Sequence, residues 1–142
     1  MKTLKSILFS IAILAVATVA NAKNPGSDKP FTVDYVISTY VAGVTEGNLK
    51  DFTSVLANDV TFNTVRKGGI VSLDKDDVLA NLKNSEGVKQ ECTTTVTKAK
   101  ETADGITYEV DMKYDNHSRI DMVTMVQNAG DWRISDVTTS YK

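Results

Sequence analysis

The sequence is poor in the residues that build covalent scaffolds and metal centres. It has one Cys, one His, one Trp and two Pro among 142 residues. Because Cys92 is alone, an internal disulfide is excluded, and an ordinary hydrophobic core must stabilise the fold. His117 follows Asp115-Asn116 in a predicted turn, where we expect it to be exposed to solvent. With so few suitable ligands, we predict no metal site and no cofactor.

The sequence also lacks an excess of basic residues. Lys and Arg together number 16 and Asp and Glu number 18, which gives a formal net charge of −2 at pH 7. Proteins that bind nucleic acids or anionic membrane surfaces do so mainly through basic faces. We therefore expect neither as the main partner. The sequence shows no phosphate-binding loop and no clear nucleophile and base pair.

The one long hydrophobic run lies at the N-terminus. Lys2 and Lys5 precede an uncharged, mainly apolar segment over residues 6–20, and Ala20-Asn21-Ala22 follows it. This order of basic, apolar and small-residue segments is typical of a secretory signal peptide. We predict that residues 1–22 are a signal peptide cleaved after Ala22, which would export the chain to the periplasm or the medium.

Cleavage would leave 120 residues, a length typical of one domain, and would change the formal charge from −2 to −4. The stretch KNPGSDKP, residues 23–30, is rich in Pro, Gly and charge, and we predict a flexible N-terminal segment there. Residues 31–142 are predicted to form the domain. Because no second long apolar run follows, we expect no membrane attachment after cleavage.

Apolar residues recur at helical spacing at the start of the predicted domain. They fall at i, i+3, i+4, i+7, i+8 and i+11, which is typical of one buried helix face: Val33, Val36, Ile37, Tyr40, Val41 and Val44. Thr32 is placed to cap this helix and Gly47 to end it. We expect a second, short helix from Asn48 to Leu56, and a third over residues 72–83 with aspartates in its first turn.

The rest of the domain alternates apolar and polar residues with a period of two, which is typical of β-strands. The predicted strands begin at residue 60 and continue, in order, over residues 89–100, 106–114, 118–127 and 132–141. Clusters of Gly, Asn and Asp indicate turns between them. Two helices, a strand, a third helix and then four strands predict an α+β fold, in which a cone-like curved antiparallel sheet packs against three N-terminal helices.

A register for the central hairpin follows if residues 115–117 form its loop. Met112 then pairs with Ile120 and Tyr108 with Thr124, so these side chains share one largely apolar face, and Asp121 lies on the other. We predict that the apolar face and the first helix enclose a ligand pocket. Its wall would consist of Tyr40, Phe62, Thr64, Tyr108, Val110, Met112, Met122 and Thr124.

The order of these elements, together with YVAGVTEGNLKDFTSVLANDVTF over residues 40–62, resembles the nuclear-transport-factor-two-like superfamily. Ketosteroid isomerase and the polyketide cyclases share its cone-shaped fold. Further marks are the Gly47-Asn48 corner and the final strand, which begins Gly130-Asp131-Trp132-Arg133-Ile134. With its predicted export, the chain looks most like the bacterial secreted family labelled putative lumazine-binding. The resemblance implies a pocket between helices and sheet, and frequent dimers through the sheet.

The resemblance also allows a test of catalytic residues. Ketosteroid isomerases use a carboxylate base on the first strand, and a Tyr and a protonated Asp as oxyanion donors. The Tyr position falls on Tyr40, but the base position falls on Thr64 and the second donor on Thr124. A threonine hydroxyl cannot replace a carboxylate base. We therefore assign no catalytic residue, and keep only Asp59 and Tyr40 on a shortlist.

Three hypotheses on function follow. The first, favoured by the missing base, is an exported, non-catalytic domain that binds an apolar or aromatic small molecule, such as lumazine or a pterin. The second is a structural module whose cavity is filled by its own side chains and which forms a homodimer through the outer face of the sheet. The third is a lyase or isomerase of the ketosteroid isomerase or dehydratase type that uses Asp59 and Tyr40 in an untypical arrangement.

Overall fold

A computed structural model describes residues 30–142 of the chain. The predicted signal peptide and nearly all of the predicted flexible segment lie outside the described residues. Residues Phe31–Lys142 form one compact unit. Within the described part of the chain, no helix combines the length and the hydrophobicity that a membrane crossing requires.

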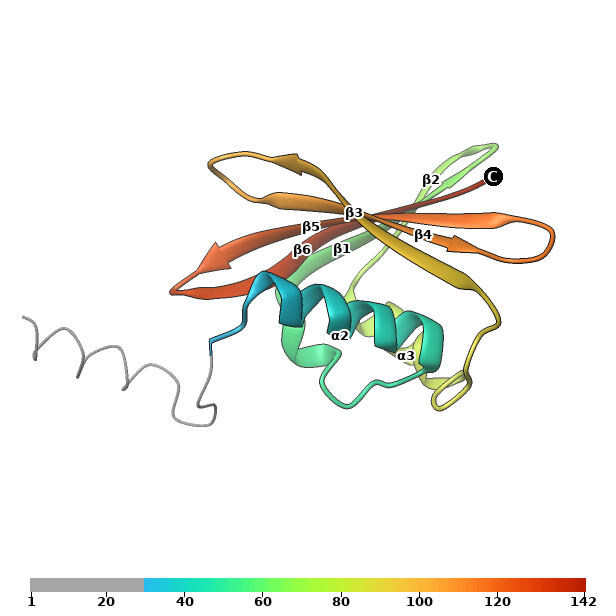
Figure 1. Ribbon diagram of the computed structural model, residues 1–142, viewed down its shortest axis with the longest axis horizontal. Helices are drawn as coiled ribbons and strands as arrows, with labels where there is room; N and C mark the ends of the chain where they lie inside the picture. The colour runs from blue at the N-terminus through green and yellow to red at the C-terminus, as the bar shows by residue number, and fades with distance from the viewer. Residues whose placement is uncertain (1–29) are drawn as a thin grey trace, which may run out of the picture. The chain divides into compact units, whose positions relative to one another are not determined.

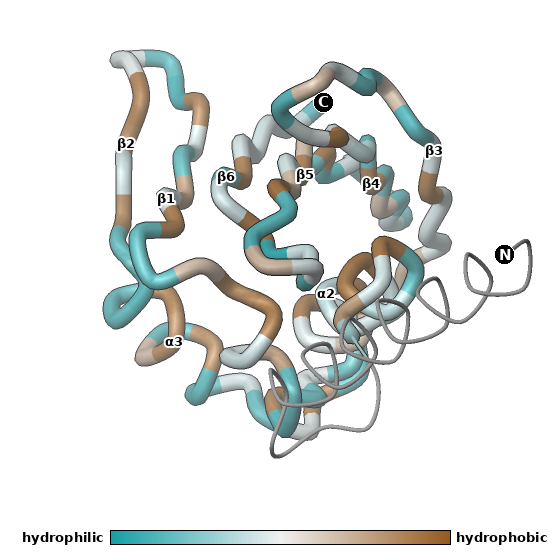
Figure 2. The backbone as a smooth tube through the Cα atoms, turned by 90° about the vertical axis from the view of Figure 1, so that its left-hand side faces the viewer, coloured by the Kyte–Doolittle hydropathy of each residue, from teal (hydrophilic) through white to brown (hydrophobic). Residues whose placement is uncertain are grey.

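Two α-helices, one short 3-10 helix and six strands make up the described domain. In chain order they are α2 (Val33–Glu46), η1 (Thr53–Val55), β1 (Leu56–Arg66), β2 (Gly69–Leu73), α3 (Lys75–Lys83), β3 (Thr93–Glu101), β4 (Ile106–Lys113), β5 (Ser118–Asn128) and β6 (Asp131–Tyr141). Both α-helices lie on the same side of the sheet (Figure 1), and the strands curve around from β2 to β3 (Figure 2). The predicted α+β fold with a curved sheet is confirmed.

The six strands form one sheet in the order β2-β1-β6-β5-β4-β3. β1 and β6 run parallel, with Phe62 opposite Val137 and Thr64 opposite Thr139. The other four neighbouring pairs are antiparallel. The sheet is therefore mixed rather than antiparallel throughout, because β6, at the end of the chain, pairs with the first strand of the domain.

Helix α2 forms where the sequence predicts it. The hydroxyl of Thr32 accepts a hydrogen bond of 3.2 Å from the backbone N–H of Tyr35 and so caps the first turn. Gly47 ends the helix in the left-handed conformation, with a φ of 66°, which glycine adopts without strain. Most of the predicted apolar stripe is buried, with Tyr40 completely inaccessible.

The prediction of a second α-helix from Asn48 to Leu56 is wrong. The segment from Asn48 onward contains only the 3-10 turn η1, and β1 already begins at Leu56. Phe52 and Val55 are nevertheless completely buried. Their helix-like spacing therefore reflects contact with the core along an irregular segment rather than a second α-helix.

The third helix begins later than predicted, at Lys75. Asp74 is its N-cap, because the Asp74 carboxylate accepts a hydrogen bond of 3.0 Å from the N–H of Asp77.

The residues directly before Asp74 belong to β2, a strand absent from the sequence-based prediction. β2 pairs with β1 in a hairpin in which Arg66 faces Gly69. Five residues without clear alternation are too weak a local signal for a strand, so pairing with β1 decides their structure.

The hydrophobic core lies between the helices and the concave face of the sheet. Its buried members come from α2, from the η1 segment and from the four strands β1, β4, β5 and β6. They are Val36, Ile37, Tyr40, Val44, Phe52, Val55, Leu56, Val60, Val110, Met112, Val123, Met125, Ile134 and Val137. Burial of apolar surface stabilises a fold by about 25 cal/mol per Å². In a chain with one free cysteine, this burial must be the main stabilising contribution.

The register of the β4–β5 hairpin differs by one residue from the prediction. The loop spans Tyr114–His117 and is closed by a hydrogen bond of 2.9 Å from the Tyr114 N–H to the His117 carbonyl. Lys113, rather than Tyr114, therefore faces Ser118. The predicted loop is one residue too short, because Tyr114 leaves the strand to join the turn.

This shift moves every β5 side chain to the other face of the sheet, because side chains alternate along a strand. Asp121 lies opposite Val110 on the concave face, where the sequence predicts an outward position. Met122 and Thr124 lie on the outer face, where the sequence predicts a pocket wall.

Candidate functional site

A buried polar network joins α2 to the concave face of the sheet. The Tyr40 hydroxyl donates a hydrogen bond of 2.6 Å to Oδ2 of Asp121. Arg119 donates to both oxygens of the same carboxylate, from Nε at 2.9 Å and from Nη2 at 2.9 Å. The Thr139 hydroxyl donates to Oδ1 at 2.7 Å. We call these four residues the polar network.

The elements of the fold place these residues together for simple reasons. Arg119 and Asp121 are two positions apart on β5 and so point to the same face. Thr139 lies directly opposite Asp121 on β6. Tyr40 belongs to the buried stripe of α2, which packs on that face. Tyr40 and Asp121 have no exposed surface, and Thr139 is 7% exposed.

The Asp121 carboxylate has all its acceptor positions occupied. An ionised carboxylate offers about four lone-pair sites, and four hydrogen bonds reach it from Tyr40, Arg119 and Thr139. Arg119 also supplies the opposite charge that a buried carboxylate requires. Asp121 therefore has no free lone pair with which to take a proton from a substrate.

Burial and charge also hold the protons of the network in place. Burial raises the pKa of Tyr40 well above its usual value, and the adjacent Asp121 carboxylate raises that pKa further. Burial by itself lowers the pKa of Arg119, but the negative charge of Asp121 and its hydrogen bonds with the guanidinium outweigh this effect, so the pKa of Arg119 is raised. Near neutral pH, Tyr40 remains a protonated donor and Arg119 a cation. Neither can act as a general base.

Three aromatic side chains lie at the end of the sheet beside Arg119. Tyr141 is opposite Arg119 in the β5–β6 pair, and it is 51% exposed. The ring of His117 stacks on that of Tyr114, with centroids 4.7 Å apart, and lies 6.3 Å from the ring of Tyr141. The Tyr114 hydroxyl donates a hydrogen bond to Oε1 of Gln90. We call Tyr114, His117 and Tyr141 the aromatic rim. His117 is exposed, as the sequence predicts.

Three of the predicted pocket residues belong to the closed core. Tyr40, Val110 and Met112 each have 0% of their surface exposed, so a water-sized molecule does not reach them. Three others lie on the same concave face and are partly exposed: Phe62, Thr64 and Tyr108. The concave face is thus filled under α2 and accessible only in part elsewhere.

The remaining two predicted pocket residues, Met122 and Thr124, lie on the outer face of the sheet. The hydroxyl of Thr124 is 2.9 Å from the hydroxyl of Thr107, its partner on β4. The prediction that Met122 and Thr124 share a face with Tyr108 is wrong, because the hairpin register is shifted by one residue.

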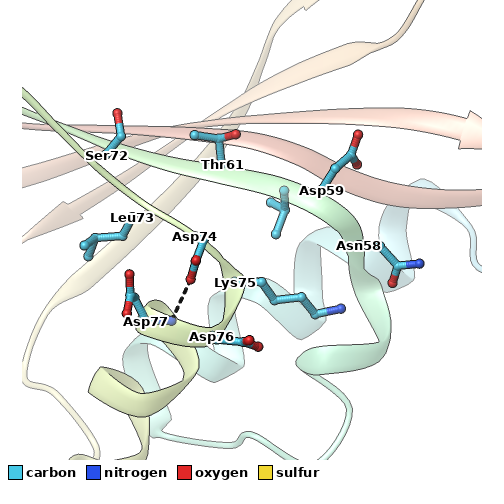
Figure 3. A pocket seen from close by; sticks show the side chains of 10 residues that line it. Asn58, Asp59, Thr61, Ser72, Leu73, Asp74, Lys75, Asp76 and Asp77 are labelled. Carbon is cyan, nitrogen blue, oxygen red and sulfur yellow. Dashed lines mark hydrogen bonds between the residues drawn. The ribbon is translucent and has the colours of Figure 1, made fainter.

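Asp59, the carboxylate on the catalytic shortlist, lies in another part of the molecule. It is exposed on β1 and lines a groove of about 530 Å³ formed with the end of β2 and the start of α3 (Figure 3). The groove is also lined by Asn58, Val60, Thr61, Ser72, Leu73, Asp74, Lys75, Asp76 and Asp77. We call it the acidic groove. Tyr40 is completely buried and does not line it, so Asp59 and Tyr40 do not meet in one open site.

Among residues 30–142, no group of three or more His, Cys, Asp or Glu side chains is arranged to hold a metal ion. The carboxylates of the acidic groove are therefore not arranged as a metal site either. Asp74 and Asp77 are instead linked through the cap of α3 (Figure 3).

The sequence-based prediction misses Arg119, Asp121 and Thr139. A signal for the first two exists, because a basic and an acidic residue two positions apart in a mostly apolar strand indicate a buried ion pair. The strand SRIDMVTMVQN carries apolar residues on both of its faces, however. Hydrophobic alternation therefore does not decide which face meets the core.

Solved structures share this fold at low sequence identity. An NTF-2 like protein of unknown function from Silicibacter pomeroyi is 15% identical, with a TM-score of 0.61 over 78% of this chain and 91% of that chain. An NTF2-like protein of unknown function from Shewanella baltica is 11% identical, with a TM-score of 0.64 over 75% of this chain and 88% of that chain. At such identities, the similarity shows the fold alone.

A further structure carries a name that refers to assembly. The putative calcium/calmodulin-dependent protein kinase type II association domain from Thiobacillus denitrificans is 16% identical to this chain. Its TM-score is 0.59, over 80% of this chain and 98% of that chain. No curated protein matches the sequence.

The family assignment rests on the sequence as well as on the fold. Residues 29–142 match the profile of the family described as Putative lumazine-binding. This match covers well over half of the chain, and the solved structures named above are NTF2-like or share that fold. The chain therefore belongs to the Putative lumazine-binding family, within the NTF2-like superfamily.

Proposed function

We propose that this chain is an exported, non-catalytic domain that binds a small planar molecule at the Arg119 end of the concave face. The observation that carries the proposal is that Arg119 is partly exposed and has hydrogen-bond donors that Asp121 does not use. Its side chain is 24% exposed, and only Nε and Nη2 are engaged with Asp121. A guanidinium has five N–H donors. Within residues 30–142, three donors of Arg119 are therefore left for a ligand.

The surroundings of Arg119 indicate the chemistry of that ligand. The aromatic rim offers planar apolar surface, with Tyr141 half exposed. Arg119 offers hydrogen-bond donors that match carbonyl or anionic oxygens. A flat ring that bears carbonyl oxygens, as in lumazine and the pterins, satisfies both requirements. The family description is consistent with a ligand of this class.

The absence of catalysis is inferred from the polar network. The Asp121 carboxylate has no free lone pair, and the Tyr40 proton is already donated to it. In the resemblance to ketosteroid isomerases, Thr64 stands at the position of their carboxylate base, and a threonine cannot act as a base at neutral pH. The network is therefore a rigid support that orients Arg119. Export is inferred from the N-terminal pattern of the sequence.

Thermal-shift measurements with lumazine, riboflavin and a steroid test the proposal. They can use residues 23–142, because the compact unit lies wholly within that range. Lumazine or riboflavin should raise the melting temperature in proportion to the logarithm of its concentration above Kd. A chain that none of the three compounds stabilises would contradict a binding function.

A matched pair of variants locates the site. Tyr141→Ala should weaken binding of the stabilising compound by about tenfold, since it removes rim surface. Tyr35→Ala removes another exposed tyrosine, 38% accessible against 51% for Tyr141, from the first turn of α2 and should leave binding unchanged. Equal weakening in both variants would contradict a site beside Arg119.

The filled core favours a second candidate function, that of a structural module. Tyr40, Val110 and Met112 have no accessible surface, so the part of the predicted pocket beneath α2 is occupied by the protein itself. Such a module could form the homodimer through the outer face of the sheet that we expect from the sequence. Light scattering during size-exclusion chromatography tests it, and a strict monomer at high concentration would exclude it.

A further inference from the structure

The two edges of the sheet differ in how they are protected. β3 forms one edge of the sheet, and three of its last four residues are charged: Lys98, Lys100 and Glu101. Charged side chains on an edge strand oppose pairing with another chain. β2, at the other edge, is the uncharged segment GIVSL, in which Ile70 is 65% and Val71 is 49% exposed. β2 is thus an open edge strand without the usual protection (Figure 1).

The chain on either side of β2 carries charges of opposite sign. Arg66, the last residue of β1, and Lys67, in the turn that leads to β2, are exposed and form no ion pair within residues 30–142. The acidic groove lies at the other end of β2, with Asp76 and Asp77 exposed beside it. β2 therefore has one basic end and one acidic end.

We propose that β2 pairs in antiparallel fashion with β2 of a second copy of this chain. The two strands would be related by a two-fold axis near Val71, the central residue of the five in β2. This pairing would join two six-stranded sheets edge to edge. It would also place Arg66 and Lys67 of each copy beside the acidic groove of the other.

Charge selects this arrangement over the alternatives. A parallel pairing of two β2 strands would bring like-charged ends together, which is unfavourable. Pairing of β2 with β3 would meet Lys98 and Lys100 and would leave a free edge at each end, so that chains could keep adding. Only the antiparallel pairing of β2 with itself is both closed and matched in charge.

The contact should be weak and sensitive to salt. Each strand contributes five residues, so the affinity rests largely on backbone hydrogen bonds, on exposed Ile70 and Val71, and on the charges at the two ends. Raising the salt concentration from about 50 mM to about 500 mM screens exposed charges and should weaken the dimer.

Sedimentation velocity on residues 23–142 with charge-reversed variants tests the proposal. The basic end is reversed by Arg66→Glu with Lys67→Glu, and the acidic end by Asp76→Lys with Asp77→Lys. Each pair of substitutions should raise the dimer Kd at least about tenfold, because like charges would then face each other. An equimolar mixture of the two variants should form a heterodimer with Kd near the wild-type value, because both contacts regain opposite charges.

A control and two outcomes complete the test. Lys98→Glu with Lys100→Glu, on β3, makes the same change in net charge as Arg66→Glu with Lys67→Glu and should leave the dimer unchanged. A chain that stays monomeric up to about 1 mM would overturn the proposal. So would a dimer whose Kd is the same in wild type and in both reversed variants, since this would place the contact elsewhere, for instance on the outer sheet face.

Discussion

Tyr40 and Asp121 lie 81 residues apart in the sequence and are joined by one hydrogen bond of 2.6 Å. The bond fastens α2 to β5, which has strands on both sides in the sheet. Neither residue has any exposed surface. Because the acceptor is a charged carboxylate in a dry environment, this bond contributes more than an average hydrogen bond. The position of α2 and the register of β5 therefore depend on each other.

Replacing Tyr40 by Phe should lower the free energy of unfolding by about 1–3 kcal/mol, because it leaves a buried carboxylate oxygen with one fewer donor. Urea denaturation followed by circular dichroism measures this change. Tyr35→Phe removes the hydroxyl of a partly exposed tyrosine on the same helix and serves as the control. Equal stability of the two variants would contradict a structural role for the Tyr40 hydroxyl.

Replacing Asp121 by Leu alone should cost about 3–5 kcal/mol, because Arg119 would be left largely buried without an opposite charge. The double variant Asp121→Leu with Arg119→Met removes both charges and should be more stable than the single variant. A double-mutant cycle from urea unfolding measures the coupling. If the losses of the two single variants simply add, the ion pair does not hold the network together.

Stability should fall above about pH 10, in part because of Tyr40. In the unfolded chain a tyrosine loses its proton near pH 10, whereas burial raises the pKa of Tyr40 well above that in the folded chain. The unfolded state then binds fewer protons, so stability decreases with rising pH, by at most about 1.4 kcal/mol per pH unit for this group. Urea unfolding at several pH values should show a shallower decline for Tyr40→Phe. Identical slopes would argue against a buried, neutral phenol.

Gly43 allows α2 to pack closely on the segment that follows it. A Cβ atom at this position would overlap the ring of Phe52. Gly43→Ala should therefore lower stability by about 1–3 kcal/mol, and adding Phe52→Leu should recover part of the loss. Gly68→Ala, in the β1–β2 turn with no atom near the new methyl group, should change stability by less than about 0.5 kcal/mol. Thermal melts of the three variants measure these differences.

The elements that local patterns define were predictable. α2 combines a six-residue apolar stripe with Thr32 at its start and Gly47 at its end, and all of these signals lie within one segment of the chain. The β3 to β6 strands follow from alternation and from turn residues in the same way. The apolar residues from Phe52 to Leu56 are buried as expected, but their spacing could not distinguish a helix from an irregular segment pressed against the core.

The elements that depend on pairing were not predictable from the same patterns. β2 is five residues long and is a strand because β1 lies beside it. The β4–β5 register depends on whether Tyr114 belongs to the strand or to the turn. One residue in that turn moved Asp121 into the core and Thr124 out of the predicted pocket.

The sequence by itself determined the superfamily, the α+β class and the burial of Tyr40, because these follow from periodicity, caps and the order of the elements. Only the tertiary structure decided what the Tyr40 hydroxyl meets. The two faces of β5 are similar in hydrophobicity, so the energy of burial barely separates them locally. The turn at Tyr114–His117 and the partners of β5 on both sides select the face that carries Arg119 and Asp121. The polar network exists because of that choice.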